Sequence, residues 1–149
     1  MHTFIKFANG VVLDPINILR YTESVRGADR TVLEIVLDGA AYDYADIEAL
    51  YDNLEALATV VITETNTDEE GNTTETDYQY NNFDLPVSLS KTKNAEYCTI
   101  NLKISQKTVS EIQQEQLLQD SLDTQMAVIE LAAMVAEMQT TQDSTVEEA

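Results

Sequence analysis

The stretch Tyr97–Leu118, YCTINLKISQKTVSEIQQEQLL, contains the change of pattern that decides the fold. In its first nine residues Ile100, Leu102 and Ile104 alternate with polar residues, as in a strand that buries one face. From residue 110 onward the chain has no Gly and no Pro and is rich in helix-forming residues. The sequence therefore predicts a β-rich part that ends near residue 106 and a long helix after it.

Upstream of this stretch, the alternating segments predict a series of strands. Asn9-Gly10 separates two apolar runs and predicts a tight hairpin, because both turn positions require a positive φ. Strand 31–38 is the most apolar and is expected mid-sheet, and a polar turn at 23–30 is expected to precede it. Pro86 limits the segment 85–90 to a sheet edge or to the start of a strand. The other strands are expected at 16–22, 59–65, 76–80 and 97–105, and the helical spacing of apolar residues predicts a short helix at 44–57.

The expected fold class is α+β: an antiparallel β-rich body with one short helix, followed by a long C-terminal α-helix. We expect some six or seven strands in one sheet. The predicted domains are a β-rich body at 1–106, a long amphipathic helix for oligomerisation or docking at 107–139, and an acidic flexible tail at 140–149. A flexible tail is expected because its residues are polar and acidic.

The C-terminal helix carries apolar residues three or four positions apart, which places them on one stripe. A helix of about 30 residues reaches roughly 45 Å, whereas a body of about 105 residues has a radius of gyration near 13 Å. We therefore expect the stripe to contact another chain. As a coiled-coil seam it is imperfect, because Glu115 and Gln119 occupy positions that should be apolar. The predicted interface residues are Leu118, Leu122, Met126, Ile129, Ala133 and Ala136.

The charge of the chain restricts its partners. Among 149 residues, 27 Asp and Glu face 8 Lys and Arg, giving a formal net charge of −19. Nucleic acids and anionic membranes bind chiefly through Lys and Arg, so neither is expected as a partner. Glu130 and Glu137 interrupt the longest apolar stretch, and the N-terminal residues read as a strand, so neither a membrane span nor a signal peptide is expected.

No residue is expected to be catalytic, to bind a cofactor or to ligate a metal. The single cysteine, Cys98, falls on the inward face of a strand, where a free cysteine packs as a small apolar side chain. The single histidine, His2, lies at the terminus, where a general base would lack an orienting partner and a buried environment. Motifs of acyl transfer, nucleotide binding and zinc hydrolysis are missing from the sequence. The chain is therefore expected to be non-enzymatic, with no cofactor and no small-molecule substrate.

Two features leave alternatives open. The acidic loop 66–77 has oxygen ligands and a glycine spaced as in an EF-hand loop, but it ends on Asp77 and its flanks read as strands. It is either a calcium loop or a solvated loop that discourages edge pairing. Tyrosines are numerous, and they either pack within the body or contribute to an interface. The candidates for an interface are Tyr42, Tyr44, Tyr78 and Tyr80.

Several segments of the chain resemble small structural proteins of tailed bacteriophages that infect Gram-positive bacteria. The resemblance covers most of the chain, and none of its motifs is catalytic. It lies in the order of a hairpin with an Asn-Gly turn followed by RYTESVRGADRTVLEIVLDG (20–39), DIEALYDNLEAL (46–57), TVVITE (59–64), CTINLKISQKT (98–108) and EQLLQDSLDTQMAVIELAAMVAE (115–137).

The resemblance implies an accessory subunit of the tail, baseplate or virion surface that is made in the host cytoplasm and assembled into the virion. Its expected partners are other copies of itself and other virion proteins. Two alternatives stay open. One is a capsid-decorating or head-fibre protein, which would differ only in where it docks. The other is an acidic inhibitor that mimics DNA, although the carboxylates of the helix are dispersed among Gln, Ser and Thr.

Overall fold

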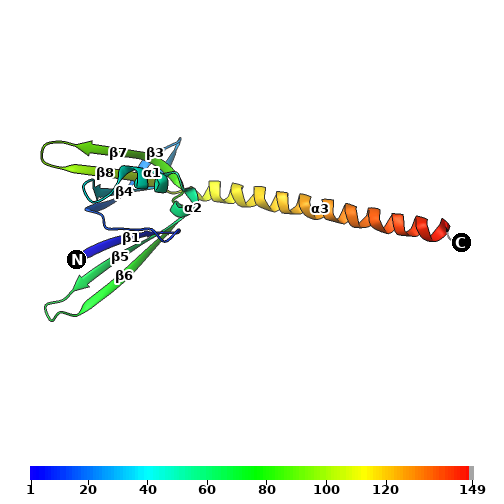
Figure 1. The fold of residues 1–149 in the computed structure, drawn as a ribbon, viewed down its shortest axis with the longest axis horizontal. Helices are drawn as coiled ribbons and strands as arrows, with labels where there is room; N and C mark the ends of the chain where they lie inside the picture. Colours follow the sequence, from blue (N-terminus) through cyan, green and yellow to red (C-terminus); the bar gives the residue numbers. More distant parts are fainter. Residues whose placement is uncertain (148–149) are drawn as a thin grey trace. The chain divides into compact units, whose positions relative to one another are not determined.

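The computed structural model describes residues 1–147 and forms two compact units, one spanning Met1–Thr108 and one that begins at Val109. The first unit contains two antiparallel sheets of four strands and two short helices, and the second is a single long helix (Figure 1). The α+β fold class is therefore confirmed. The division between the units falls two residues beyond the expected end of the body at residue 106.

The first sheet has the strand order β2-β1-β5-β6. The predicted hairpin of β1 and β2 is confirmed, but the expectation of a positive φ at both turn positions is wrong, because Gly10 takes a φ of 89° and Asn9 does not take a positive φ. Strand β1 also pairs along its whole length with β5, which places Ile5 opposite Ile62. The bounds are β1 (His2–Phe7), β2 (Val12–Leu13), β5 (Thr59–Thr67) and β6 (Thr73–Asn81).

The second sheet has the order β3-β4-β8-β7, so the central position of β4 and the edge position of β7 are confirmed. The polar turn expected at 23–30 is wrong, because β3 and β4 continue to a two-residue turn. Arg26 and Gly27 form this turn with φ of 52° and 79°, as tight hairpins require. The bounds are β3 (Asn17–Val25), β4 (Ala28–Asp38), β7 (Leu85–Lys93) and β8 (Cys98–Ser105).

The single helix expected at 44–57 is divided into α1 (Tyr44–Tyr51) and α2 (Leu54–Leu57). The division occurs at Asn53, whose side-chain oxygen accepts a hydrogen bond from the backbone N–H of Ala56 and so begins a new helix. Asp43 caps α1 in the same way. Ile47 and Leu50 of α1 are buried in the core.

The expectation of one sheet with six or seven strands is wrong, because the eight strands are shared between two sheets with one core. Alternate residues of β4 and β8 supply one side of this core, as their period of two requires. Residues of β1 and β5 supply the other side, and Phe83 lies in the connection between β6 and β7. The fully buried large side chains are Ile5, Phe7, Val32, Leu33, Ile35, Leu37, Leu57, Val60, Phe83, Ile100, Leu102 and Ile104.

The second unit is α3 (Val109–Glu147), a helix of 39 residues and about 58 Å. The expected helix end at residue 139 is wrong, because the expected tail continues the helix as far as residue 147. The last two residues of that tail, 148–149, lie outside the described residues. Among the described residues, no helix is both long and apolar enough to cross a membrane.

Candidate functional site

Helix α3 carries all six predicted interface residues. We call them the first row: Leu118, Leu122, Met126, Ile129, Ala133 and Ala136. Because a helix turns 100° per residue, these positions share one stripe along the helix. All six are exposed, and the exposed fraction is 64% for Leu118, 47% for Leu122 and 68% for Ile129. The chain by itself therefore leaves this stripe open to a partner.

A second set of large apolar side chains on α3 was not predicted from the sequence. We call it the second row: Leu117, Val128, Leu131, Val135 and Met138. Each of these side chains is between 45% and 69% exposed. Their positions fit alternating steps of four and three from residue 117, with Ser121 and Thr124 filling the two gaps. This spacing, visible in the sequence, is that of a second coiled-coil seam. It is overlooked when the seam is assumed to contain Leu122 and Ile129.

The polar side chains of α3 bond along the helix itself. Gln116 donates a hydrogen bond to Asp120 at 3.0 Å, and Gln119 donates one to Asp123 at 2.9 Å. These pairs are four residues apart, the spacing at which helical neighbours meet. The Thr124 hydroxyl donates to the backbone carbonyl of Asp120 at 2.9 Å. Thr124, which fills a gap in the second row, therefore has its hydroxyl hydrogen-bonded within the helix.

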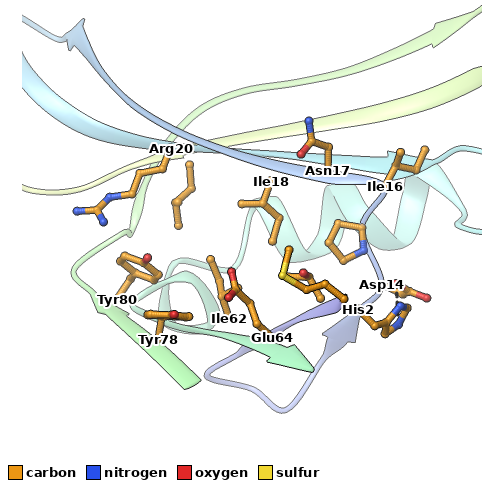
Figure 2. Close-up of a pocket in the computed structure, with 14 residues that line it drawn as sticks. His2, Asp14, Ile16, Asn17, Ile18, Arg20, Ile62, Glu64, Tyr78 and Tyr80 are labelled. Atoms are coloured by element: carbon orange, nitrogen blue, oxygen red, sulfur yellow. Dashed lines mark ion pairs between the residues drawn. The ribbon is translucent and has the colours of Figure 1, made fainter. Parts of the chain in front are cut away.

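The body contains an open cleft of about 640 Å³, which β3 lines on one side and β5 and β6 line on the other. Figure 2 shows Ile18 and Arg20 of β3 facing Ile62 and Glu64 of β5 across the cleft. A further part of the lining comes from the N-terminal residues and the loop after β2. The volume lies in the range of small-molecule sites, but the lining is a mixture of aliphatic, aromatic and charged groups.

Two polar pairs mark this cleft. The guanidinium of Arg20 lies 5.2 Å from the centre of the Tyr80 ring, within cation–π range. At the other end, His2 Nε2 lies 3.4 Å from Asp14 Oδ1, so the expectation that His2 lacks an orienting partner is wrong. Both side chains of that pair are about half exposed, where an ion pair contributes little.

The acidic loop expected at 66–77 is shorter in the structure, because β5 continues to Thr67 and β6 begins at Thr73, so the hairpin turn is 68–72. Asp68 Oδ1 accepts hydrogen bonds from the backbone N–H groups of Glu70 and Asn72, and Asp68 Oδ2 accepts one from the Asn72 amide. Gly71 takes a φ of 86° in the turn. Over the part of the chain that the structure describes, no three His, Cys, Asp or Glu side chains are grouped to hold a metal ion. The carboxylate of Asp68 therefore closes the turn of the hairpin.

These hydrogen bonds give the loop a pH dependence. The bonds from the side chain and backbone of Asn72 lower the pKa of Asp68 below its ordinary value of 3.8. Because the pKa of Asp68 is lower in the folded state, the ionised carboxylate stabilises the turn above about pH 4. This stabilisation is lost as the pH falls through the lowered pKa and the carboxylate is protonated. We expect Asn72→Ala to raise the pKa of Asp68 towards 3.8, measured by NMR titration of the Asp68 carboxyl carbon. An unchanged titration in the variant would contradict the role of Asn72.

Cys98 and the candidate tyrosines differ in how far they are buried. Cys98 is half-buried and lies against Gly39, which leaves no room for a larger residue at that glycine. Tyr42 packs against the core, and its hydroxyl accepts a hydrogen bond from the backbone N–H of Asp14 at 2.7 Å. Tyr78 and Tyr80 both line the cleft, and Tyr78 is the more exposed of the two. Of the four interface candidates, only Tyr78 is exposed, and the other three are partly buried against the core.

Comparisons with protein-family models, with curated proteins and with solved structures found no match to this chain. The basis for a function is therefore the chain itself. Its most unusual feature is α3, where two rows of apolar side chains are exposed on a single helix.

Proposed function

We propose that this protein is a non-enzymatic structural subunit of a bacteriophage virion, an accessory component of the tail or baseplate that assembles through α3. The observation that carries the proposal is the exposure of the first row, in which Leu118, Leu122 and Ile129 contact water. An isolated helix gains most of its stability by packing an apolar face against something else. A chain that presents such a face on a helix of 39 residues is built to be joined to other chains.

The charge of the chain supports the same role. Between residue 108 and the C-terminus the sequence has nine acidic residues and no basic one. Like charges keep the free subunits soluble despite the exposed apolar side chains. They also favour approach to a surface of positive potential, as electrostatic complementarity at an interface requires. We expect that the first row docks on a virion protein with basic residues beside an apolar groove.

The phage assignment is supported by the resemblance of the segments quoted above to small structural proteins of tailed phages. A separately folded body and an appended docking helix are what such a subunit needs. A capsid-decorating or head-fibre protein would use the same parts on a different surface of the particle. A DNA mimic would instead use its carboxylates against a basic enzyme channel.

The test is incorporation into virions. We expect Leu122→Asp combined with Ile129→Asp to reduce incorporation at least tenfold, because the variant places two carboxylates in the middle of the first row. Particles purified by density gradient are analysed by immunoblot. The matched control is Gln116→Asp combined with Ala127→Asp, which adds the same two negative charges to the helix and leaves every residue of the first row in place.

Near-UV circular dichroism of the tyrosines should show an intact body in both variants, because the changes lie outside Met1–Thr108. Full incorporation of the Leu122→Asp, Ile129→Asp variant would overturn the docking role of the first row. Absence of the wild-type chain from particles, together with salt-sensitive binding to a nucleic-acid enzyme, would replace the proposal by the DNA-mimic alternative.

A further inference from the structure

The second row of α3 faces a different direction from the first. With 100° per residue, the centres of the two rows lie roughly 150° apart around the helix axis. One neighbouring helix covers a stripe far narrower than that. A partner on the first row therefore leaves Val128, Leu131 and Val135 exposed. The second row needs an occupant of its own.

We infer that the second row is the seam of a parallel, two-stranded coiled coil between two copies of this chain. The inference deepens the assembly role proposed above, since it assigns self-pairing to the second row and docking to the first. The seam runs from Leu117 to Met138 in steps of four and three, the period of a left-handed coiled coil. Val128 and Val135 take one seam position, and Leu131 and Met138 take the other. A β-branched residue at the first position with Leu at the second favours two parallel strands.

The order of residues along the seam favours a parallel pairing of two copies of α3 over an antiparallel one. Its N-terminal half contains Ser121 and Thr124, and its C-terminal half is wholly apolar. In a parallel pair Ser121 meets Ser121, and each apolar residue meets its equivalent. An antiparallel pair would place these hydroxyl residues against Leu131 and Val135. The Thr124 hydroxyl is already bonded to the Asp120 carbonyl, so its methyl group is free to enter the seam.

The charges of α3 are compatible with pairing of two acidic copies. None of the seven seam positions between Leu117 and Met138 is charged. Asp120 occupies a flanking position, where a parallel partner presents the uncharged Gln125. The remaining carboxylates of this stretch, Asp123, Glu130 and Glu137, recur every seven residues on the outer side. The two copies therefore keep most of their like charges apart while the apolar side chains meet.

The area of the seam is adequate for a specific interface. Transfer free energies imply that a large aliphatic side chain loses roughly 60–100 Å² of accessible surface when it is buried. Five such side chains on each of two copies give about 600–1,000 Å² of apolar area. Contacts of the flanking residues add to this and bring the total to the range of specific interfaces, which begins at about 1,000 Å².

The experiment is disulfide trapping in the full chain with Cys98→Ala, so that each variant contains one cysteine. Ser121→Cys places a thiol in the seam, and the matched control Asp123→Cys places one two residues away on the outer side. In a parallel pair the two copies of residue 121 lie within disulfide distance, whereas the two copies of residue 123 are separated by the width of the helices. We expect mild oxidation to give at least tenfold more interchain disulfide for Ser121→Cys than for Asp123→Cys.

Two further variants locate the interface. Leu131→Asp combined with Val135→Asp should abolish trapping at residue 121 and halve the mass measured by light scattering. Leu122→Asp combined with Ile129→Asp, which changes only the first row, should leave trapping unchanged. Equal trapping at residues 121 and 123, or a wild-type chain that is monomeric at micromolar concentration, would overturn the inference.

The outcomes also separate this inference from the proposed function. If no interchain disulfide forms at residue 121 but the chain enters virions normally, the parallel pair is rejected and the virion role is retained. Efficient trapping at residue 121 in a chain that never enters virions would support the pair and remove the virion role.

Discussion

Replacement of Phe83 by alanine is expected to destabilise the body by about 3–5 kcal/mol, the usual cost of removing a buried aromatic ring. Phe83 is 0% exposed and lies in the connection between the two sheets, with its ring 5.9 Å from the Tyr80 ring in an edge-to-face arrangement. The free energy of unfolding should be measured with denaturant. Tyrosine near-UV circular dichroism is the appropriate signal, because the helix dominates the far-UV spectrum and the chain has no tryptophan.

Tyr78→Ala is the matched control for the Phe83 variant. Tyr78 is an aromatic residue of the same region, but it is 44% exposed. We expect the control to lose less than about 1 kcal/mol, since surface substitutions have small effects. A loss below about 1 kcal/mol for Phe83→Ala would mean that the two sheets do not share the core described above.

Replacement of Lys107 by methionine is expected to cost about 3 kcal/mol, because it leaves the carboxylate of Asp84 without its cation. Lys107 Nζ lies 2.8 Å from Asp84 Oδ2, and the two side chains are only 16% and 18% exposed. The pair joins the segment after β8 to the connection between β6 and β7. The backbone N–H of Lys107 reinforces this junction by donating to the carbonyl of Asn82 at 2.9 Å. Loss of the pair therefore weakens the contact between the two sheets.

A double-mutant cycle isolates the energy of this pair. Lys107→Met combined with Asp84→Leu should recover most of the stability, since an apolar pair of similar volume often replaces a buried ion pair at little cost. Lys91→Met, at an exposed position of β7, is the control for loss of a lysine charge and should have almost no effect. If Lys107→Met and Lys91→Met were equally mild, the ion pair would not contribute to the junction of the sheets.

The local elements follow closely from residue periodicity. The Asn9-Gly10 hairpin, the central position of β4 and the edge position of β7 were all predicted and are confirmed. The errors are local too. The turn at Arg26-Gly27 is shorter than its polar surroundings suggested, because polar residues of β3 continue to pair with β4. Helix α3 passes residue 139, since neither Gly nor Pro is present to end it there.

The candidate interface could be predicted only in part. The first row was found because its apolar residues recur at helical spacing, and all six lie exposed on α3 as expected. The second row was missed because polar residues, Ser121 and Thr124, fill two of its seven positions. The cleft could not be predicted at all, since it forms where Arg20 of β3 faces Glu64 and Tyr80 of the β5–β6 hairpin, which belongs to the other sheet.

The sequence by itself determined most of the secondary structure, the acidic charge and the separation of a β-rich body from a long helix. Each of these depends on composition or on the spacing of neighbouring residues. Only the tertiary structure decided that eight strands form two sheets, that β1 pairs with β5, and that Lys107 meets Asp84. The physical reason is that strands pair through backbone groups which nearly every residue possesses. Side-chain periodicity therefore defines the buried face of a strand, whereas the partner strand is selected by how all the buried faces fit together.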